Sequence, residues 1–281
     1  MNILYVNDND LAGRRFNGYD LQIMLNDIKG YSAKQVVVSK ASDNPNVLPL
    51  VCDEWSKFLR ERCKDFERRI SMQSVIYPFG ERIFELEEFE KADIVHFHLI
   101  FNQYLSIFSF RDLAKKKPTI WTLHDPWAIT GHCVYPVDCK GWLTGCKKCP
   151  NLDRYSPLGE DNASEIWQIK NKVYKDIDID VIVASEWMYQ LVTQSPLGKH
   201  FKRIHLIPFG IDLELFKRRN REKIRQSLGI KKNDFVIMFR QDNQEWKGLV
   251  YIREMLEKLD VKKDIVIITV GTTKLLEDLK N

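Results

Sequence analysis

The residues best suited to chemistry lie in one stretch, TIWTLHDPWAITGHCVYPVDCKGWLTGCKKCP, which covers residues 119–150. It begins as an apolar run typical of a β-strand and reaches His124 and Asp125 just before a proline. In open parallel sheets, ligands bind at the carboxyl ends of the strands. We therefore predict that His124 and Asp125 belong to an active site, where the carboxylate would fix the tautomer of the imidazole. A core histidine bonded to a backbone carbonyl is the alternative.

Four cysteines follow in the same stretch, at spacings that suit a metal site. They include one Cys-x-x-Cys pair, and a tetrahedral zinc site tolerates the wider gaps when a loop wraps the ion. Four thiolates leave no open coordination position, so the zinc would be structural, and no catalytic metal is expected. Reduced or oxidised thiols without metal are the alternative, and His132 could replace one cysteine. The predicted ligands, within a loop over 131–150, are Cys133, Cys139, Cys146 and Cys149.

Length and composition indicate an ordinary globular chain. Its 281 residues suit two domains of roughly 150 residues each. Hydrophobic residues make up 44% and charged residues 29%, and the net charge is +4. The basic residues are interspersed with acidic ones, whereas a nucleic-acid binder needs a clustered basic face. Nucleic acid is therefore not an expected partner.

The chain has no stretch that approaches the ~20 apolar residues needed to span a bilayer. The opening residues, MNILYVNDND, lack the basic start and apolar core of a signal peptide. We expect a cytoplasmic protein whose thiols are reduced. Peripheral association with the inner face of a membrane stays open, because basic patches such as residues 115–117 can touch anionic lipid.

Short apolar strands alternate with helices, which predicts an α/β fold with a doubly wound parallel sheet. The helix expected at 53–70 is amphipathic, with its apolar residues on one stripe, Trp55, Phe58, Leu59, Phe66 and Ile70. In the first domain we predict strands at 2–7, 35–38, 94–98, 119–123, 181–184 and 204–207, and helices at 21–28, 53–70, 105–114, 166–174 and 186–194.

A domain boundary is predicted after Pro208, and the alternation restarts beyond it. Helices are expected at 224–228 and 249–259, and strands at 235–239 and 265–269. Arg240 would end a strand, and Lys247 and Gly248 would begin the next helix, whose dipole favours an anion. Two surface cations are the alternative. Gly13, in the turn after the first strand, could likewise bring backbone amides near a phosphate.

Several segments, taken in order, resemble retaining glycosyltransferases of the GT-B architecture, in the large fourth sequence family and its group 1-like members. The cysteine stretch resembles a subgroup acting in bacterial surface-polysaccharide synthesis. Residues 207–212 resemble the crossover between two Rossmann-like domains, with Phe209 where the family usually has asparagine. The other matching segments are residues 93–98, residues 183–187, and Arg240 with Lys247 and Gly248.

The resemblance implies transfer of a hexose from a nucleoside diphosphate sugar to a glycan or lipid-linked acceptor, with retention. Residues 1–208 would form the acceptor-side domain and residues 209–281 part of the donor-nucleotide domain. The family's paired glutamates, which hold the donor, are not found, so we expect a truncated chain with little or no activity. His124 would contact the transferred sugar. The alternative function is a non-catalytic, zinc-stapled α/β module that binds a carbohydrate or a protein.

Overall fold

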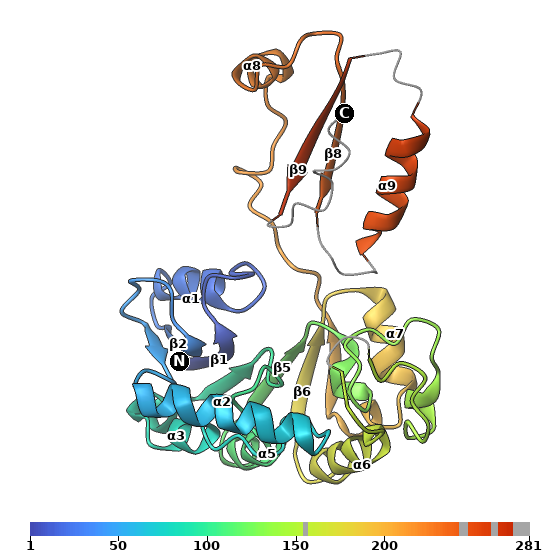
Figure 1. Ribbon diagram of the computed structural model, residues 1–281. Coiled ribbons are helices and arrows are strands. Elements are labelled where there is room, and N and C mark those ends of the chain that lie inside the picture. Colours follow the sequence, from blue (N-terminus) through green and yellow to red (C-terminus); the bar gives the residue numbers. More distant parts are fainter. Residues whose placement is uncertain (154–156, 242–246, 260–263, 272–281) are drawn as a thin grey trace. The chain divides into compact units, whose positions relative to one another are not determined.

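The computed structural model describes residues 1–153, 157–241, 247–259 and 264–271 (Figure 1). Its contacts divide the chain into two compact units, residues 1–211 and residues 212–281. Each unit contains its own parallel sheet. Among the described residues, none of the helices is both long and apolar enough to cross a membrane.

The first unit is built on a seven-stranded sheet with the order β3-β2-β1-β4-β5-β6-β7. Every neighbouring pair of strands in it is parallel. The sheet is therefore doubly wound around β1, as expected from the alternation of elements. Its strands are β1 (Asn2–Asn9), β2 (Ser32–Ser39), β3 (Val47–Pro49), β4 (Ile94–Phe97), β5 (Thr119–Leu123), β6 (Ile179–Val183) and β7 (Arg203–Leu206).

The central strands are buried along most of their length, which explains their continuous apolar sequences. A parallel sheet covered on both faces needs apolar side chains on both sides of each strand. Residues 36–38 of β2 and residues 95–97 of β4 are accordingly buried without alternation. The predicted strands of this unit are all confirmed; β3 was missed because a run of three residues has no readable period.

Three helices of the first unit begin at a polar residue whose side chain caps them. Asp53, Ser106 and Ser185 each accept a hydrogen bond from a backbone amide in the first turn of the following helix. Figure 1 shows α2, α3, α5 and α6 together along one side of the sheet. The helices are α1 (Tyr19–Asn26), α2 (Glu54–Arg69), α3 (Gly80–Phe84), α4 (Glu87–Lys91), α5 (Ile107–Lys116), α6 (Ala163–Tyr174) and α7 (Glu186–Gln194).

Helix α2 is present as predicted, but its aromatic residues face outward. An amphipathic helix normally buries its apolar stripe. Here the buried positions are Ser56 and Glu67. The Glu67 carboxylate accepts the backbone amides of residues 74, 75 and 76, and this ties the helix to the next segment. Three aromatic side chains of the stripe are more than half exposed: Trp55, Phe58 and Phe66.

The segment with the four cysteines has little regular structure. It contains two short 3-10 helices, η1 (Pro126–Ile129) and η2 (Gly141–Leu143). A further 3-10 turn, η3 (Gly198–His200), lies between α7 and β7. Trp127 and Trp142 of the cysteine segment are buried, so the segment packs into the core although most of it is neither helix nor strand.

The second unit contains two parallel strands and two helices among its described residues. Its elements are α8 (Arg221–Ser227), β8 (Phe235–Arg240), α9 (Leu249–Lys258) and β9 (Ile265–Val270), and all four were predicted. Strand β8 pairs with β9 from Phe235 to Arg240. Strand, helix and parallel strand follow each other as in a Rossmann-like unit.

Candidate active site

Two histidines meet at the carboxyl ends of β4 and β5. His98 follows β4 and His124 follows β5, and these strands are neighbours in the sheet. His98 Nδ1 lies 3.0 Å from His124 Nε2, and the two rings stack with centroids 5.3 Å apart. In such a contact one nitrogen donates and the other accepts, so at least one ring is neutral. The imidazole of His124 is therefore oriented by His98.

A third histidine extends this stack into the sheet. His96 stacks on His98 with centroids 4.5 Å apart, and its Nε2 lies 2.8 Å from the Thr122 hydroxyl. Burial lowers the pKa of His124 to about 4. Burial, with a smaller contribution from His124, lowers the pKa of His96 to about 3. Burial also holds the pKa of His98 well below its usual value. All three rings are consequently neutral near pH 7, which suits positioning through hydrogen bonds better than a permanent charge.

Aromatic side chains and a glycine surround the histidine stack. Phe209 stacks on His124 at 5.6 Å and contacts Phe16 at 4.8 Å, and both phenylalanines remain partly exposed. Gly18 has φ of 89° and lies so close to Tyr5 and His98 that a Cβ atom would come within 2.6 and 2.9 Å of them. Any larger residue would collide there, so Gly18 allows the loop before α1 to approach the histidines.

Asp125 does not orient His124 as the sequence suggested. Its carboxylate accepts the Trp127 amide at 2.9 Å and caps the 3-10 helix η1. Burial raises the pKa of Asp125 to about 7, partly offset by the Trp127 hydrogen bond and by the charge of Lys170. Asp125 thus stabilises the 3-10 helix that follows His124.

Lys170 is a buried residue that sequence reasoning missed. It is 1% exposed, and its ammonium donates to the carbonyls of Trp127, Thr130 and Gly131 at 2.6, 3.0 and 3.1 Å. Burial holds its pKa well below the usual value. Its place on the apolar stripe of α6, between Trp167 and Tyr174, was the available signal.

The four predicted metal ligands and His132 line one small cavity, and the ligand atoms of His132, Cys133 and Cys149 lie within 4.8 Å of one another. His132 Nε2 is 3.1 Å from Cys149 Sγ and 3.7 Å from Cys133 Sγ. Cys146 Sγ accepts the Gly131 amide, and Cys139 Sγ accepts the Gly141 amide, both at 3.3 Å. Burial raises the pKa of Cys133 to about 12 and that of Cys146 to about 11, with the neighbouring thiols adding to the shift.

The predicted phosphate-binding residues fall in different units. Arg240 is the last residue of β8, and Gly248, with φ of 75°, precedes the first residue of α9. Lys247 stands next to Gly248 and is exposed. Residues 242–246, which connect them to Arg240, lie outside the described part of the chain. Gly13 lies in the first unit, in a turn with φ of 70° and open space around its Cα.

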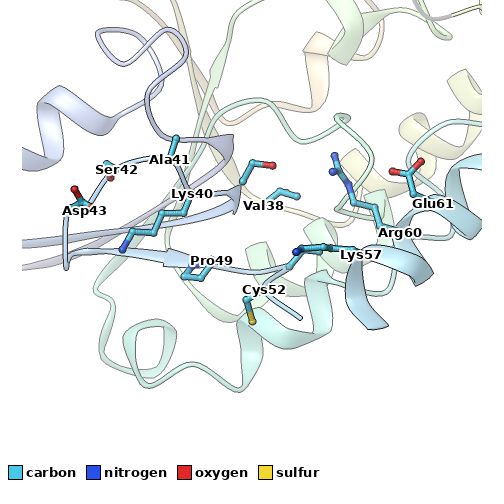
Figure 2. Close-up of a pocket in the computed structure, with 12 residues that line it drawn as sticks. Val38, Lys40, Ala41, Ser42, Asp43, Pro49, Cys52, Lys57, Arg60 and Glu61 are labelled. Carbon is cyan, nitrogen blue, oxygen red and sulfur yellow. The ribbon is translucent and has the colours of Figure 1, made fainter. Parts of the chain in front are cut away.

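A pocket not anticipated from the sequence lies at the carboxyl ends of β2 and β3, beside α2 (Figure 2). Three basic side chains line it: Lys40, Lys57 and Arg60. Figure 2 shows Lys57 and Arg60 extending from α2 near the end of β2. Arg60 also donates to the carbonyls of residues 102 and 103. The acidic residues of the lining are Asp43 and Glu61.

Comparison with known proteins identifies the fold and the family of this chain. The structure of Anabaena Alr3699/HepE in complex with UDP-glucose aligns with 99% of this chain and 64% of its own, with a TM-score of 0.52 and 13% identity. The fold is therefore the α/β, GT-B-like arrangement expected from the sequence. Residues 50–215 match the profile of Glycosyltransferase Family 4, and the chain belongs to this family.

Part of the chain is also similar in sequence to a curated glycosyltransferase. Over 91 residues the chain is 35% identical to the putative colanic acid biosynthesis glycosyl transferase WcaC of Escherichia coli (strain K12). The match covers 30% of this chain and 22% of WcaC. The chain thus spans about a fifth of that relative and about two thirds of HepE.

Proposed function

We propose that the protein transfers a hexose from a nucleoside diphosphate sugar to a glycan or lipid-linked acceptor, with retention at the anomeric carbon. The observation that carries this proposal is the pair of His98 and His124 at the carboxyl edge of the sheet, in a chain of this family. The resemblance to WcaC supports a role in bacterial surface polysaccharide synthesis. The bond between sugar and phosphate breaks, the acceptor oxygen takes the sugar, and the diphosphate leaves with the acceptor's proton.

The donor would be held by the second unit. A departing diphosphate gains negative charge, which fixed cations and helix amides stabilise. Arg240 at the end of β8 and Lys247 with Gly248 at the start of α9 supply such groups, and we assign Gly13 a backbone contact. Losing one cation would cost about 3 kcal/mol of transition-state stabilisation. His124, neutral and oriented by His98, would position the transferred sugar.

The acceptor would be held by the first unit. In the pocket beside α2, Lys40, Lys57 and Arg60 outnumber the acidic Asp43 and Glu61, and this favours an acceptor with an anionic group. The exposed aromatic residues of α2 favour peripheral contact with a membrane surface, where a lipid-linked acceptor would be presented. Lys57 and Arg60 belong to α2 and Lys40 follows β2. From the exposed aromatic residues of α2 we infer that the acceptor is attached to lipid.

Nucleotide binding tests the donor assignment. We expect nucleoside diphosphates, with uridine diphosphate tested first, to raise the melting temperature of the full chain. At a hundredfold excess over Kd, binding adds about 2.7 kcal/mol to the free energy of unfolding. Arg240→Ala should reduce this shift, whereas Arg221→Ala, at an exposed arginine of α8 in the same unit, should retain it.

Lack of stabilisation by any nucleotide would contradict the transferase proposal. A zinc-stapled module that binds a carbohydrate or a protein would then be the better explanation. A shift that survives Arg240→Ala unchanged would instead contradict the role of that guanidinium. The measurement reports binding directly and does not depend on turnover.

A further inference from the structure

We propose that the protein holds one structural zinc-class ion through His132, Cys133 and Cys149, with a third thiolate from Cys146 or Cys139. This ligand set has one imidazole and three sulfurs, in place of the four sulfurs suggested by the sequence. The ion would clamp the segment that connects His124 to α6. The proposed metal site is separate from the residues assigned to the donor. The proposal does not depend on the transferase function.

The first reason is the distances among three ligand atoms. His132 Nε2, Cys133 Sγ and Cys149 Sγ all lie within 4.8 Å of one another. In a tetrahedral zinc site, bonds of about 2.0 Å to nitrogen and 2.3 Å to sulfur place neighbouring ligand atoms roughly 3.5–3.8 Å apart. The observed separations of 3.1 and 3.7 Å from His132 Nε2 to the two sulfurs are close to this spacing. Small side-chain rotations would complete the geometry.

The second reason is the position of the remaining thiols. Cys139 and Cys146 line the same small cavity as the other three residues. A Cβ on Gly141 would lie 3.4 Å from Cys139 Sγ and 3.8 Å from the Cα of Cys146, so both cysteines border this glycine. Neither sulfur belongs to the group of ligand atoms within 4.8 Å of one another, so a side-chain rotation would bring one of them in as the fourth ligand. Backbone amides donate to both sulfurs, and such hydrogen bonds stabilise thiolates over thiols.

The third reason is the chemistry of the donor set. Imidazole and thiolate are the ligands that zinc prefers, and hard cations such as magnesium prefer oxygen. His132 is fully buried and Cys133 nearly so, whereas Cys139, Cys146 and Cys149 are partly exposed, so one side of the cluster is shielded from solvent. Four protein ligands leave no position for water or substrate, and this makes the ion a structural element.

The ion would act on the active site through the packing of its loop. Gly131, next to His132, lies so close to α6 that a Cβ would be 2.4 Å from the Ala163 carbonyl. Lys170 of α6 binds the Gly131 and Thr130 carbonyls on the same segment. A metal anchored at His132 would thus fix the chain that begins at His124 against α6.

Metal analysis and cobalt substitution test the proposal on the full chain. Protein purified under reducing conditions should contain about one equivalent of zinc. After chelation, Co(II) should bind at one equivalent with the absorption of a tetrahedral site and sulfur-to-cobalt charge transfer for three thiolates. We expect Cys149→Ser and His132→Ala to weaken Co(II) binding at least tenfold, and only one of Cys139→Ser and Cys146→Ser to do so. Cys52→Ser, at an exposed cysteine outside the cluster, is the matched control.

Three results would overturn the proposal. The first is wild-type protein that neither contains metal nor binds Co(II) or Zn(II). The second is a Co(II) absorption spectrum typical of four thiolate ligands that does not change in His132→Ala. The third is a disulfide between Cys133 and Cys149, mapped by mass spectrometry in protein purified under reducing conditions. The measurements on the wild-type chain remain decisive if a variant fails to fold.

Discussion

At the scale of single residues, the site depends on side chains whose partners come from elsewhere in the chain. His124 is oriented by His98, 26 residues earlier, and Lys170 reaches back about 40 residues to three carbonyls. A buried ammonium is costly unless its hydrogen bonds are satisfied. Because Lys170 belongs to α6, the conformation of the loop after β5 depends on the packing of α6 against it.

We predict that Lys170→Met destabilises the protein by about 3 kcal/mol, because the buried carbonyls lose their donor. Chemical denaturation followed by tryptophan fluorescence would measure the change. Lys172→Met, at an exposed position on the same helix, is the matched control and should change stability by less than about 0.5 kcal/mol. Equal stability of the two variants would mean that water can satisfy the carbonyls.

At the scale of elements, α2 departs most from expectation. The sequence predicted an amphipathic helix with its apolar residues on one stripe, and Trp55, Phe58 and Phe66 of that stripe are exposed. Trp55 stacks on Phe58, and the Arg62 guanidinium lies 5.6 Å from the Phe58 ring. Aromatic and basic side chains together on one exposed helix face are typical of interfacial helices.

We predict that the full chain associates with vesicles containing anionic phospholipid, and that replacing both Trp55 and Phe58 with serine lowers the partition coefficient about tenfold. The estimate assumes that each aromatic side chain loses part of the roughly 1.5–3 kcal/mol available from full burial. Trp187→Ser, at a half-exposed tryptophan of α7, should bind like the wild type. Co-sedimentation would measure the difference. Wild-type protein that stays in the supernatant would refute a membrane role for this helix.

At the scale of the whole molecule, the neutral histidines make the stability of the first unit depend on pH. Exposed histidine has a pKa of about 6.5 in an unfolded chain. In the folded chain the pKa is about 4 for His124 and about 3 for His96. Between pH 6.5 and these values the unfolded chain binds more protons, so stability decreases as the pH falls. Asp125, with its pKa raised to about 7, has the opposite effect between about pH 4 and 7.

A variant isolates the contribution of one histidine. We predict that His96→Gln loses about 1.6 kcal/mol less stability than the wild type between pH 6.5 and 5, since the unfolded histidine goes from half to nearly full protonation over that range. Urea denaturation at the two pH values would measure the difference. Equal losses of stability in both proteins would mean that His96 titrates normally in the folded chain.

The order of the longer elements was predictable from the sequence. Apolar strands, helix periodicity and capping residues are local signals, so the strands of both units except β3 were located from the sequence alone. The cysteine stretch and His124 were also identified as candidates. The short β3, α3 and α4 were missed because segments of three to five residues carry too few positions for a period.

The sequence by itself determined an α/β chain of this family with His124 at the end of a strand and thiols in the loop that follows. Only the tertiary structure decided that His98 orients His124, that His132 joins the thiols, that Lys170 holds the loop, and which face of α2 is exposed. Strand order and register bring β4 beside β5, and the rotation of a helix is set by its packing. Strand order, strand register and helix rotation depend on contacts between residues far apart in the sequence, so a local pattern does not encode them.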